Sequence, residues 1–358
     1  MKAPTVPNTS FVDKEFGGVD QLLEYCKALP KIELHAHLNG SISPESLRQL
    51  AEKRLAGTVG EAEAATGALS VLEALEWKDT FDLKDFFPMF KHIYALTNNM
   101  AWLVFIVHGV IKDFEDDGVR YLELRSTPRD DASTGLTKEL YVQTVLQAIS
   151  TSPATKISTR LILTIDRRHS PEVAMQIVDL AIRFRDQGVV GVDLAGDPYA
   201  ADFDCKHALL KAKAAGLKVT IHLGEIENRE AESASMLEVR PDRLGHATFL
   251  SEQLRAHVYE ERIAVEMCMT SNVLCRTVSS YEEHHIKEAL ELDHPSILCT
   301  DDKSIFASPL SCEYALAAST FSMTKQQLFD LSKKSIDAIF ANSEEKTRLR
   351  GVWDTWAP

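Results

Sequence analysis

The sequence predicts an α/β protein of the (β/α)8 TIM barrel class, with a helical insertion between the first and second strands. Eight short apolar, β-branched runs end in polar or glycine residues, and stretches with helical periodicity separate most of them. Strands that alternate with helices favour a parallel sheet buried on both faces, and eight repeats favour closure into a barrel. The expected strands are Lys31–Leu38, Val119–Ser126, Thr159–Ile165, Val189–Leu194, Lys218–Leu223, Arg243–His246, Ile263–Cys268 and Ser296–Thr300.

Two of the intervening stretches show the helical pattern clearly. Pro171–Gln187 places Val173 and Ile177 on one face, with further apolar residues following at helical spacing. Asp204–Ala215 precedes Gly216, a residue type that commonly ends a helix. Both stretches therefore fit the helices that connect parallel strands.

The chain of 358 residues could hold two or three domains of nominal size, but one enlarged barrel also fits. About 80 residues separate the first two strands, far more than a crossover requires. We therefore expect a helical insertion at about residues 45–115, a leading arm at residues 1–29, and a single domain over residues 1–358. The aromatic segment Phe81–Phe90 would let the insertion act as a lid over the barrel mouth, and a merely decorative insertion is the alternative.

Composition and charge exclude several classes of protein. The 53 acidic residues against 39 basic ones give a net charge of −14, which disfavours a nucleic-acid polymer as partner but allows a small anion held by local cations. No apolar run approaches the ~18 residues of a membrane helix, and the start lacks the layout of a secretory signal. The six cysteines are scattered, as in reduced proteins. We expect a cytoplasmic monomer without a membrane partner.

The strongest chemical signal is a set of polar residues at the C-terminal ends of expected strands, where barrels carry their functional groups. The first strand ends in His35-Ala36-His37, and the period of two places both imidazoles on one side. Such a pair alone is more often explained by ordinary packing than by a metal site. The fifth strand, however, ends in His222-Leu223, and the eighth is followed by Asp301 and Asp302, which would be costly if buried unpaired. Three histidines and an aspartate form a ligand set suited to zinc.

Further acid–base groups fall beside these candidate ligands. Glu225 would point away from His222 in a continuous strand, but Gly224 lets the chain turn so that Glu225 faces the site. His246, at the end of the sixth strand, and Asp302 are left as neighbours of a metal-bound water. Because a catalytic zinc lowers the pKa of its water towards ~7, the set favours a metal-dependent hydrolase.

The ordered motifs HAHLNGS, VDLAGDP, IHLGE, RLGHA, MTSN and CTDD resemble those of the adenosine deaminase superfamily of metal-dependent barrel hydrolases. The resemblance runs from about Pro30 to about Phe340. Asn39, where the nucleoside-specific enzymes carry Asp, is similar to the adenosine deaminase-like branch. The stretch YLELRSTPR at Tyr121–Arg129 also resembles that branch, whose corresponding loop holds a nucleotide phosphate.

The resemblance implies a reaction and a set of site residues. The reaction is hydrolytic deamination at C6 of a purine nucleoside monophosphate, most typically N6-methyl-AMP to IMP and methylamine. Glu225 would donate a proton to purine N1, while His246 and Asp302 orient or deprotonate the water. One Zn²⁺ per chain would bind to His35, His37, His222 and Asp301. The implied substrate-binding residues are His37, Asn39, Tyr94, Ser126, Thr127, Pro128, Arg129, Asp166, Gly196, Glu225 and Asp302.

Other functions stay open at this point. Arg129 suits a phosphate because its guanidinium offers two parallel donors, although on general grounds it could be a surface ion-pair partner. The branch usually has His where this chain has Tyr94, and a second basic residue where it has Asp130. Both departures favour the alternative of an adenosine deaminase that forms inosine and ammonia. A catalytically silent binding protein is a more distant alternative.

Overall fold

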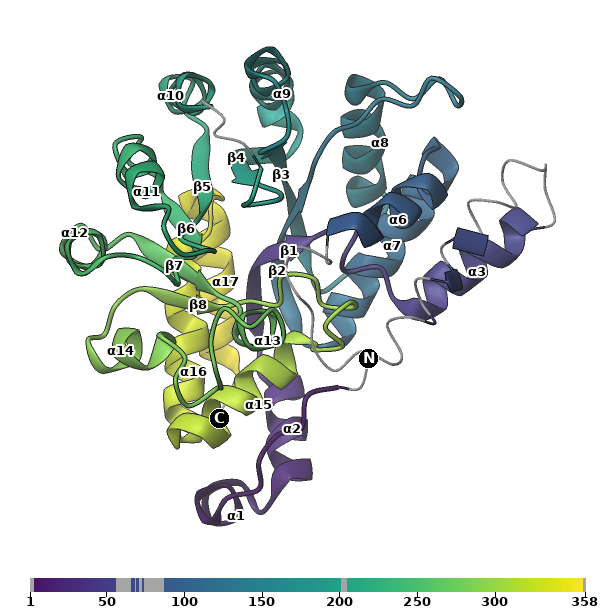
Figure 1. Ribbon diagram of the computed structural model, residues 1–358. Coiled ribbons are helices and arrows are strands. Elements are labelled where there is room, and N and C mark those ends of the chain that lie inside the picture. The colour runs from purple at the N-terminus through teal and green to yellow at the C-terminus, as the bar shows by residue number, and fades with distance from the viewer. Residues whose placement is uncertain are drawn as a thin grey trace.

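A single parallel sheet of eight strands forms the centre of the protein, seen in the computed structural model (Figure 1). The structure describes residues 3–55, 87–200 and 205–356, together with residues 66, 67, 69, 70 and 73. Each strand pairs in parallel with the next along the chain, and a bridge between Ala36 and Asp301 joins the last strand's end to the first. The predicted (β/α)8 barrel is thus confirmed. The strands are β1 (Lys31–His37), β2 (Val119–Ser126), β3 (Ser158–Asp166), β4 (Val189–Ala195), β5 (Lys218–Leu223), β6 (Arg243–His246), β7 (Ala264–Met267) and β8 (Ser296–Leu298).

Helices connect the strands and surround the barrel (Figure 1). Helix α9 (Pro171–Phe184) begins where Ser170 accepts a hydrogen bond from the backbone N–H of Val173, and Pro171 suits the first turn. It continues as the short 3₁₀ helix η2 (Arg185–Gln187), so the whole expected segment is helical. The other helices between strands are α8 (Lys138–Ser150), α10 (Lys206–Ala214), α11 (Glu230–Leu237), α12 (Glu252–Glu260), α13 (Met269–Leu274) and α14 (Ile286–Glu291). After β8 come α15 (Leu310–Phe321), α16 (Lys325–Lys334), η3 (Ser335–Ala338) and α17 (Ser343–Thr355).

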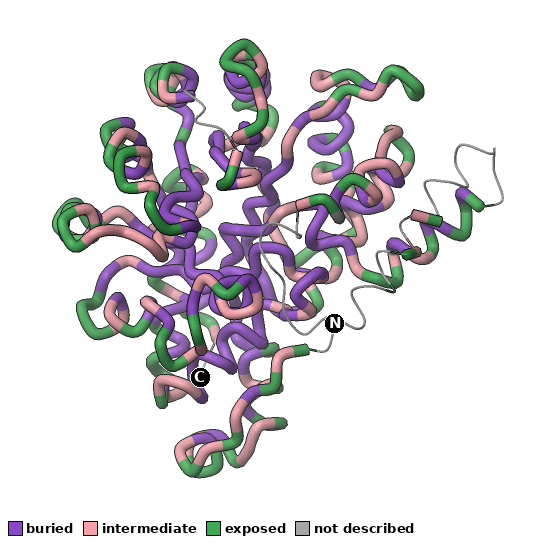
Figure 2. The backbone as a smooth tube through the Cα atoms, viewed as in Figure 1, coloured by how far each residue is buried: buried purple, intermediate pink, exposed green. Residues whose placement is uncertain are grey.

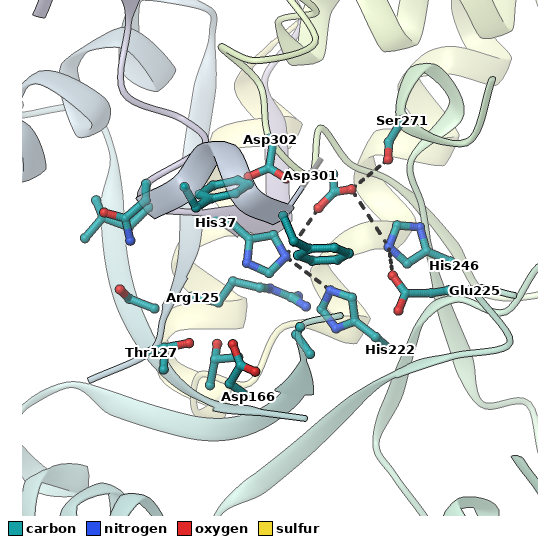
Figure 3. Close-up of a pocket in the computed structure, with 18 of the residues that line it drawn as sticks. His37, Arg125, Thr127, Asp166, His222, Glu225, His246, Ser271, Asp301 and Asp302 are labelled. Atoms are coloured by element: carbon teal, nitrogen blue, oxygen red, sulfur yellow. Dashed lines mark hydrogen bonds and ion pairs between the residues drawn. The ribbon is translucent and has the colours of Figure 1, made fainter. Parts of the chain in front are cut away.

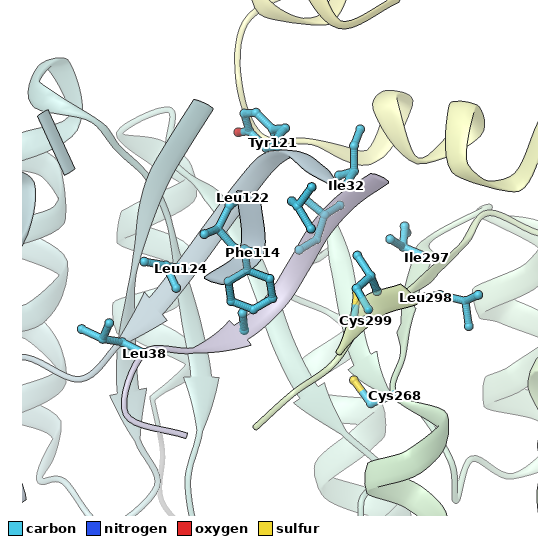
Figure 4. Packing of buried hydrophobic residues seen from close by; sticks show 14 of the residues in the cluster. Ile32, Leu38, Phe114, Tyr121, Leu122, Leu124, Cys268, Ile297, Leu298 and Cys299 are labelled. Atoms are coloured by element: carbon cyan, nitrogen blue, oxygen red, sulfur yellow. The ribbon is translucent and has the colours of Figure 1, made fainter. Parts of the chain in front are cut away.

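The hydrophobic core lies between the sheet and these helices. Figure 2 shows buried positions along the strands and exposed ones on the outer faces of the helices. Strand β1 is buried along almost its whole length, as expected of a parallel strand covered on both faces. Phe114, Leu122 and Leu124 belong to this core and have no exposed surface (Figure 4).

The N-terminal arm forms two helices, α1 (Ser10–Phe16) and α2 (Val19–Ala28), which both contact α15. The hydroxyl of Tyr25 in α2 donates a 2.8 Å hydrogen bond to the carbonyl of Lys325 at the start of α16. Residues near both ends of the chain therefore pack together.

The expected insertion contains α3 (Pro44–Leu55), η1 (Phe87–Met89), α6 (Phe90–Leu96) and α7 (Met100–Asp116). Phe81 and Phe86, predicted to belong to the lid, lie outside the described residues. Helix α7 packs against β2 and α8, so it belongs to the outer ring of the barrel. Among the described helices none alone is long and apolar enough to cross a membrane, and only α6 with α7, bent by 115°, meets that test as a pair.

Candidate active site and metal centre

Three imidazoles and a carboxylate meet at the C-terminal ends of β1, β5, β6 and β8. One ligand-type atom from each of His35, His222, His246 and Asp301 lies within 4.8 Å of those of the others. His37 Nε2 joins them, 3.1 Å from His222 Nε2 and 3.3 Å from Asp301 Oδ1 (Figure 3). The four ligands that the resemblance implies therefore lie in one cluster, and His246 lies beside them.

The donor set of this cluster fits a divalent metal ion. His35 Nε2 is buried and has no hydrogen-bond partner among the described residues, while its Nδ1 lies 2.7 Å from Glu266 Oε2. His222 repeats the pattern, with Nδ1 3.0 Å from Asp193 Oδ1. A carboxylate on Nδ1 fixes the tautomer in which Nε2 offers its lone pair to a metal. His37 Nε2 lies 3.1 Å from His222 Nε2, and Asp301 Oδ1 lies 3.3 Å from both His35 Nε2 and His37 Nε2. These separations approach the distance of roughly 3.3–3.4 Å between two ligand atoms of a tetrahedral metal site with bonds of about 2.0–2.1 Å.

Two glycines make room for the cluster and explain part of its motifs. A Cβ on Gly245 would lie 2.8 Å from His35 Cε1, and one on Gly40 would lie 1.5 Å from Asp302 Oδ1. Neither contact is sterically possible without movement of the neighbouring side chain. The glycines of RLGHA and HAHLNGS are therefore required by the close approach of site residues.

A layer of buried charges supports the cluster from inside the barrel. Arg125 donates to Glu266 at 2.7 Å and lies 3.3 Å from Asp193, so it contacts both carboxylates that orient the histidines. Arg243 also pairs with Glu266, at 2.6 Å. Burial would raise the pKa of Glu266, but the two guanidiniums hold that pKa well below its usual range. Sequence reasoning missed this layer, although Glu266 inside an apolar strand is a signal that could have pointed to it.

Glu225 is placed by a turn after β5. Gly224 has φ +60°, as the predicted turn requires, and Glu225 Oε1 lies 3.5 Å from His246 Nε2 (Figure 3). Burial raises the pKa of Glu225 to about 8, although Arg167 opposes the shift. At neutral pH the carboxyl therefore carries a proton that it can donate.

The short helix α13 adds contacts that sequence reasoning did not assign. Ser271 donates a 2.7 Å hydrogen bond to Asp301 Oδ2, which leaves Oδ1 directed towards the imidazoles of β1. Asn272 lies 3.5 Å from His246 Nδ1 and also contacts His284 at 3.1 Å. Both residues belong to the motif MTSN, so the motif marked the segment without revealing these roles.

A pocket opens beside the cluster and collects most of the predicted substrate-binding residues. Its volume is about 80 Å³, below the ~300–1,000 Å³ typical of small-molecule sites, so entry of a nucleotide requires some lining side chains to move. Phe87 and Phe90 of the expected insertion line it, as a lid would. The predicted residues in the lining are His37, Asn39, Tyr94, Ser126, Thr127, Asp166, Gly196, Glu225 and Asp302. Lining residues that were not predicted as part of the site include Arg168, Asn272, Cys275, Thr277 and Phe306.

Two predicted residues, Pro128 and Arg129, lie outside this lining. The guanidinium of Arg129 sits about 5 Å from the ring centres of both Tyr94 and Tyr141. It donates to the carbonyl and hydroxyl of Thr97 at 2.7 and 2.6 Å. Its Nη1 also donates to the hydroxyl of Tyr141 in α8 at 3.3 Å. The role of Arg129 as a phosphate ligand stays a prediction.

Arg168 is the cation at the rim of the pocket, with half of its side chain exposed. Its Nε and Nη2 donate to the two carboxylate oxygens of Asp166 at 2.8 and 2.6 Å. Burial opposes ionisation of Asp166, but this pairing holds the pKa of the carboxyl below its usual range. The pair therefore presents a fixed carboxylate and a guanidinium side by side.

A parallel barrel with a histidine–aspartate cluster and an adjacent carboxylic acid defines a class of metal-dependent hydrolases. Residues 30–356 match the adenosine deaminase family, and the chain belongs to it. It is 41% identical over 347 residues to the N6-methyl-AMP deaminase of Homo sapiens, with 94% of this chain and 95% of the relative covered.

Solved structures agree with this assignment. The ADAL–IMP complex is 38% identical with a TM-score of 0.86, covering 93% of this chain and 98% of the other. The Arabidopsis N6-mAMP deaminase MAPDA is also 38% identical with a TM-score of 0.86, covering 93% of this chain and all of the other. The family membership inferred from the motifs is confirmed.

Proposed function

We propose that the protein is a hydrolytic deaminase acting at C6 of a purine nucleoside monophosphate, converting N6-methyl-AMP into IMP and methylamine. The observation that carries the proposal is a buried Glu225, with its pKa raised by burial, beside a histidine–aspartate cluster at the mouth of an adenosine deaminase family barrel. The human relative's name and the IMP complex of a structural neighbour support the choice of substrate.

We further propose that one zinc ion per chain binds to His35, His37, His222 and Asp301. Imidazole nitrogens and a carboxylate oxygen are the ligands of catalytic zinc sites, and the supporting carboxylates Glu266 and Asp193 are of the usual kind. When bound, the ion supplies a water of lowered pKa as nucleophile. Metal analysis of the purified protein tests the assignment, and a chain that is active with less than one equivalent of metal would reject it.

The chain's own residues supply the acid–base chemistry. Glu225 donates its proton to purine N1, which draws electron density from C6 and favours attack there. Burial keeps the pKa of His246 well below its usual range, so its imidazole is neutral and free to accept a proton from water. Asp302, whose Oδ1 has no hydrogen-bond partner among the described residues, lines the same pocket and can hold or relay that proton to the leaving amine.

The rival is an adenosine deaminase that prefers the unphosphorylated substrate. The commitment of Arg129 to Thr97 favours that rival, whereas Asn39, which lines the pocket and is similar to the adenosine deaminase-like branch, favours a nucleotide. A panel of N6-methyl-AMP, AMP, N6-methyladenosine and adenosine separates the two by kcat/KM. We expect the highest value for N6-methyl-AMP, and a preference for either nucleoside would overturn the proposal.

A further inference from the structure

A second cavity lies against Glu225 and is large enough for a single water molecule. Its lining comes from the end of β5 and the turn after it, from the start of α11 and from the loops after β3 and β4: Arg167, Pro198, Leu223, Gly224, Glu225, Ile226, Arg229, Glu232 and Ser233. The cavity leaves about 10 Å³ for the centre of a water molecule, close to the smallest volume that holds one. Glu225 lines both this cavity and the substrate pocket, so its carboxyl stands between them.

Three polar atoms of the lining residues are buried without a hydrogen-bond partner among the described residues. They are Glu225 Oε2, Arg167 Nε and Ser233 Oγ. Ser233 is only 1% exposed, and the other donors of Arg167 are already bound to Glu232 and to the carbonyl of His222. Buried polar groups nearly always have a partner, and an enclosed water normally has two to four.

We propose that this cavity is a water site and that its water selects which oxygen of Glu225 carries the proton. The Nε–H of Arg167 can only donate, so it occupies a lone pair of the water. We assign the second lone pair of the water to the hydroxyl of Ser233, which then acts as a donor. With both lone pairs taken, the water can only donate, and Glu225 Oε2 is the acceptor assigned to it. An oxygen that accepts from water is the carbonyl oxygen of a carboxylic acid.

The water therefore determines on which side of the Glu225 carboxyl the proton lies. With Oε2 held as the carbonyl oxygen, the acidic proton resides on Oε1, the oxygen that lies 3.5 Å from His246 Nε2. The proton that the proposed function assigns to purine N1 is therefore presented on the side of the catalytic histidine. Ser233 and Arg167 act through the water as positioning residues, and neither lines the substrate pocket.

The first experiment does not involve activity. A crystal structure of the full-length protein at a resolution that resolves bound waters should show one water within hydrogen-bonding distance of Ser233 Oγ and Glu225 Oε2. The same site in a Ser233→Ala crystal should be empty or of low occupancy. An unoccupied cavity in the unmodified protein would overturn the proposal, whatever substrate the enzyme prefers.

The second experiment measures turnover of N6-methyl-AMP. Because one hydrogen bond to the acid is weakened, Ser233→Ala should lower kcat about three- to tenfold with little change in KM. Ser235→Ala, two residues further along α11, is the matched control and should behave as the unmodified protein. The effect of Ser233→Ala should also disappear in a Glu225→Gln background, because no carboxylic proton remains to be placed.

The outcomes separate this inference from the proposed function. An equal loss from Ser233→Ala in both backgrounds would mean that Ser233 merely supports the fold and would reject the positioning role. Failure of the proposed function would appear instead as nucleoside preference in the substrate panel, with the crystallographic water still present.

Discussion

His35 and Glu266 meet at 2.7 Å in the fully buried centre of the barrel, where the carboxylate holds Nδ1 and leaves Nε2 directed into the metal cluster. The two side chains come from β1 and β7 and have no exposed surface. Glu266 also accepts hydrogen bonds from Arg125, Arg243 and the hydroxyl of Thr220. One carboxylate thus connects a metal-binding imidazole to the charged layer beneath it.

Replacing this carboxylate should weaken metal binding. We expect Glu266→Gln to lower zinc affinity about 10- to 100-fold, because the amide cannot match the carboxylate as an acceptor for His35. Affinity is measured by competition with a chelator of known strength. Glu283→Gln, on an exposed loop, is the control. Unchanged zinc affinity in folded Glu266→Gln would show that the contact does not orient the ligand.

Removing the acid should abolish activity without unfolding the chain. Glu225→Gln keeps nearly the same shape, and we expect it to retain zinc and its melting temperature while kcat falls about 10²- to 10⁴-fold. Metal content, thermal unfolding and turnover of N6-methyl-AMP are measured on one preparation. Normal turnover by this variant would reject Glu225 as the proton donor.

The raised pKa of Glu225 predicts a pH dependence of activity. Its acid form is the active one, and burial raises its pKa to about 8, above the value of an exposed carboxyl. Activity that depends on the proton is therefore present below about pH 8 and is lost as the pH rises through that value. The kcat/KM profile for the nucleotide should show this basic limb, and a profile that stays flat to pH 10 would contradict it.

Arg129 and Arg168 can be distinguished by substitution. If Arg129 turns from Thr97 to the phosphate when substrate binds, Arg129→Ala should lower kcat/KM for N6-methyl-AMP by about 10- to 100-fold and spare N6-methyladenosine. Arg168→Ala releases Asp166 and should impair both substrates. An equal loss on both from Arg129→Ala would make its contacts with Thr97 and Tyr141 structural.

The parts of the site that could be predicted are those with a local signal. His35 and His37 follow from the two-residue period of a strand, and Glu225 follows from a glycine turn after His222. Each candidate also falls at the end of a strand, where the barrel fold places its functional groups. These signals need only a few neighbouring residues, so one sequence was enough.

The rest depends on contacts between distant parts of the chain. Arg125 and Glu266 are separated by 141 positions, and nothing local in either strand indicates that they pair. Arg129 follows a strand end as expected, yet its partner Thr97 lies in the insertion, whose path the sequence did not define. Arg168 has no local signal of this kind, because its pairing with Asp166 depends on the conformation of the loop.

The bridge between Ala36 and Asp301 implies a structural role for the metal centre in addition to its chemical one. It lies on the seam where the end of the eighth strand meets the first, and the proposed ligands His35, His37 and Asp301 come from the two sides of that seam. A bound ion would link the first strand to the segment after the eighth strand, and it would therefore stabilise only the closed barrel. Because the proposed ligands lie on both sides of the seam, a chain truncated before Asp301 would lack part of the ligand set.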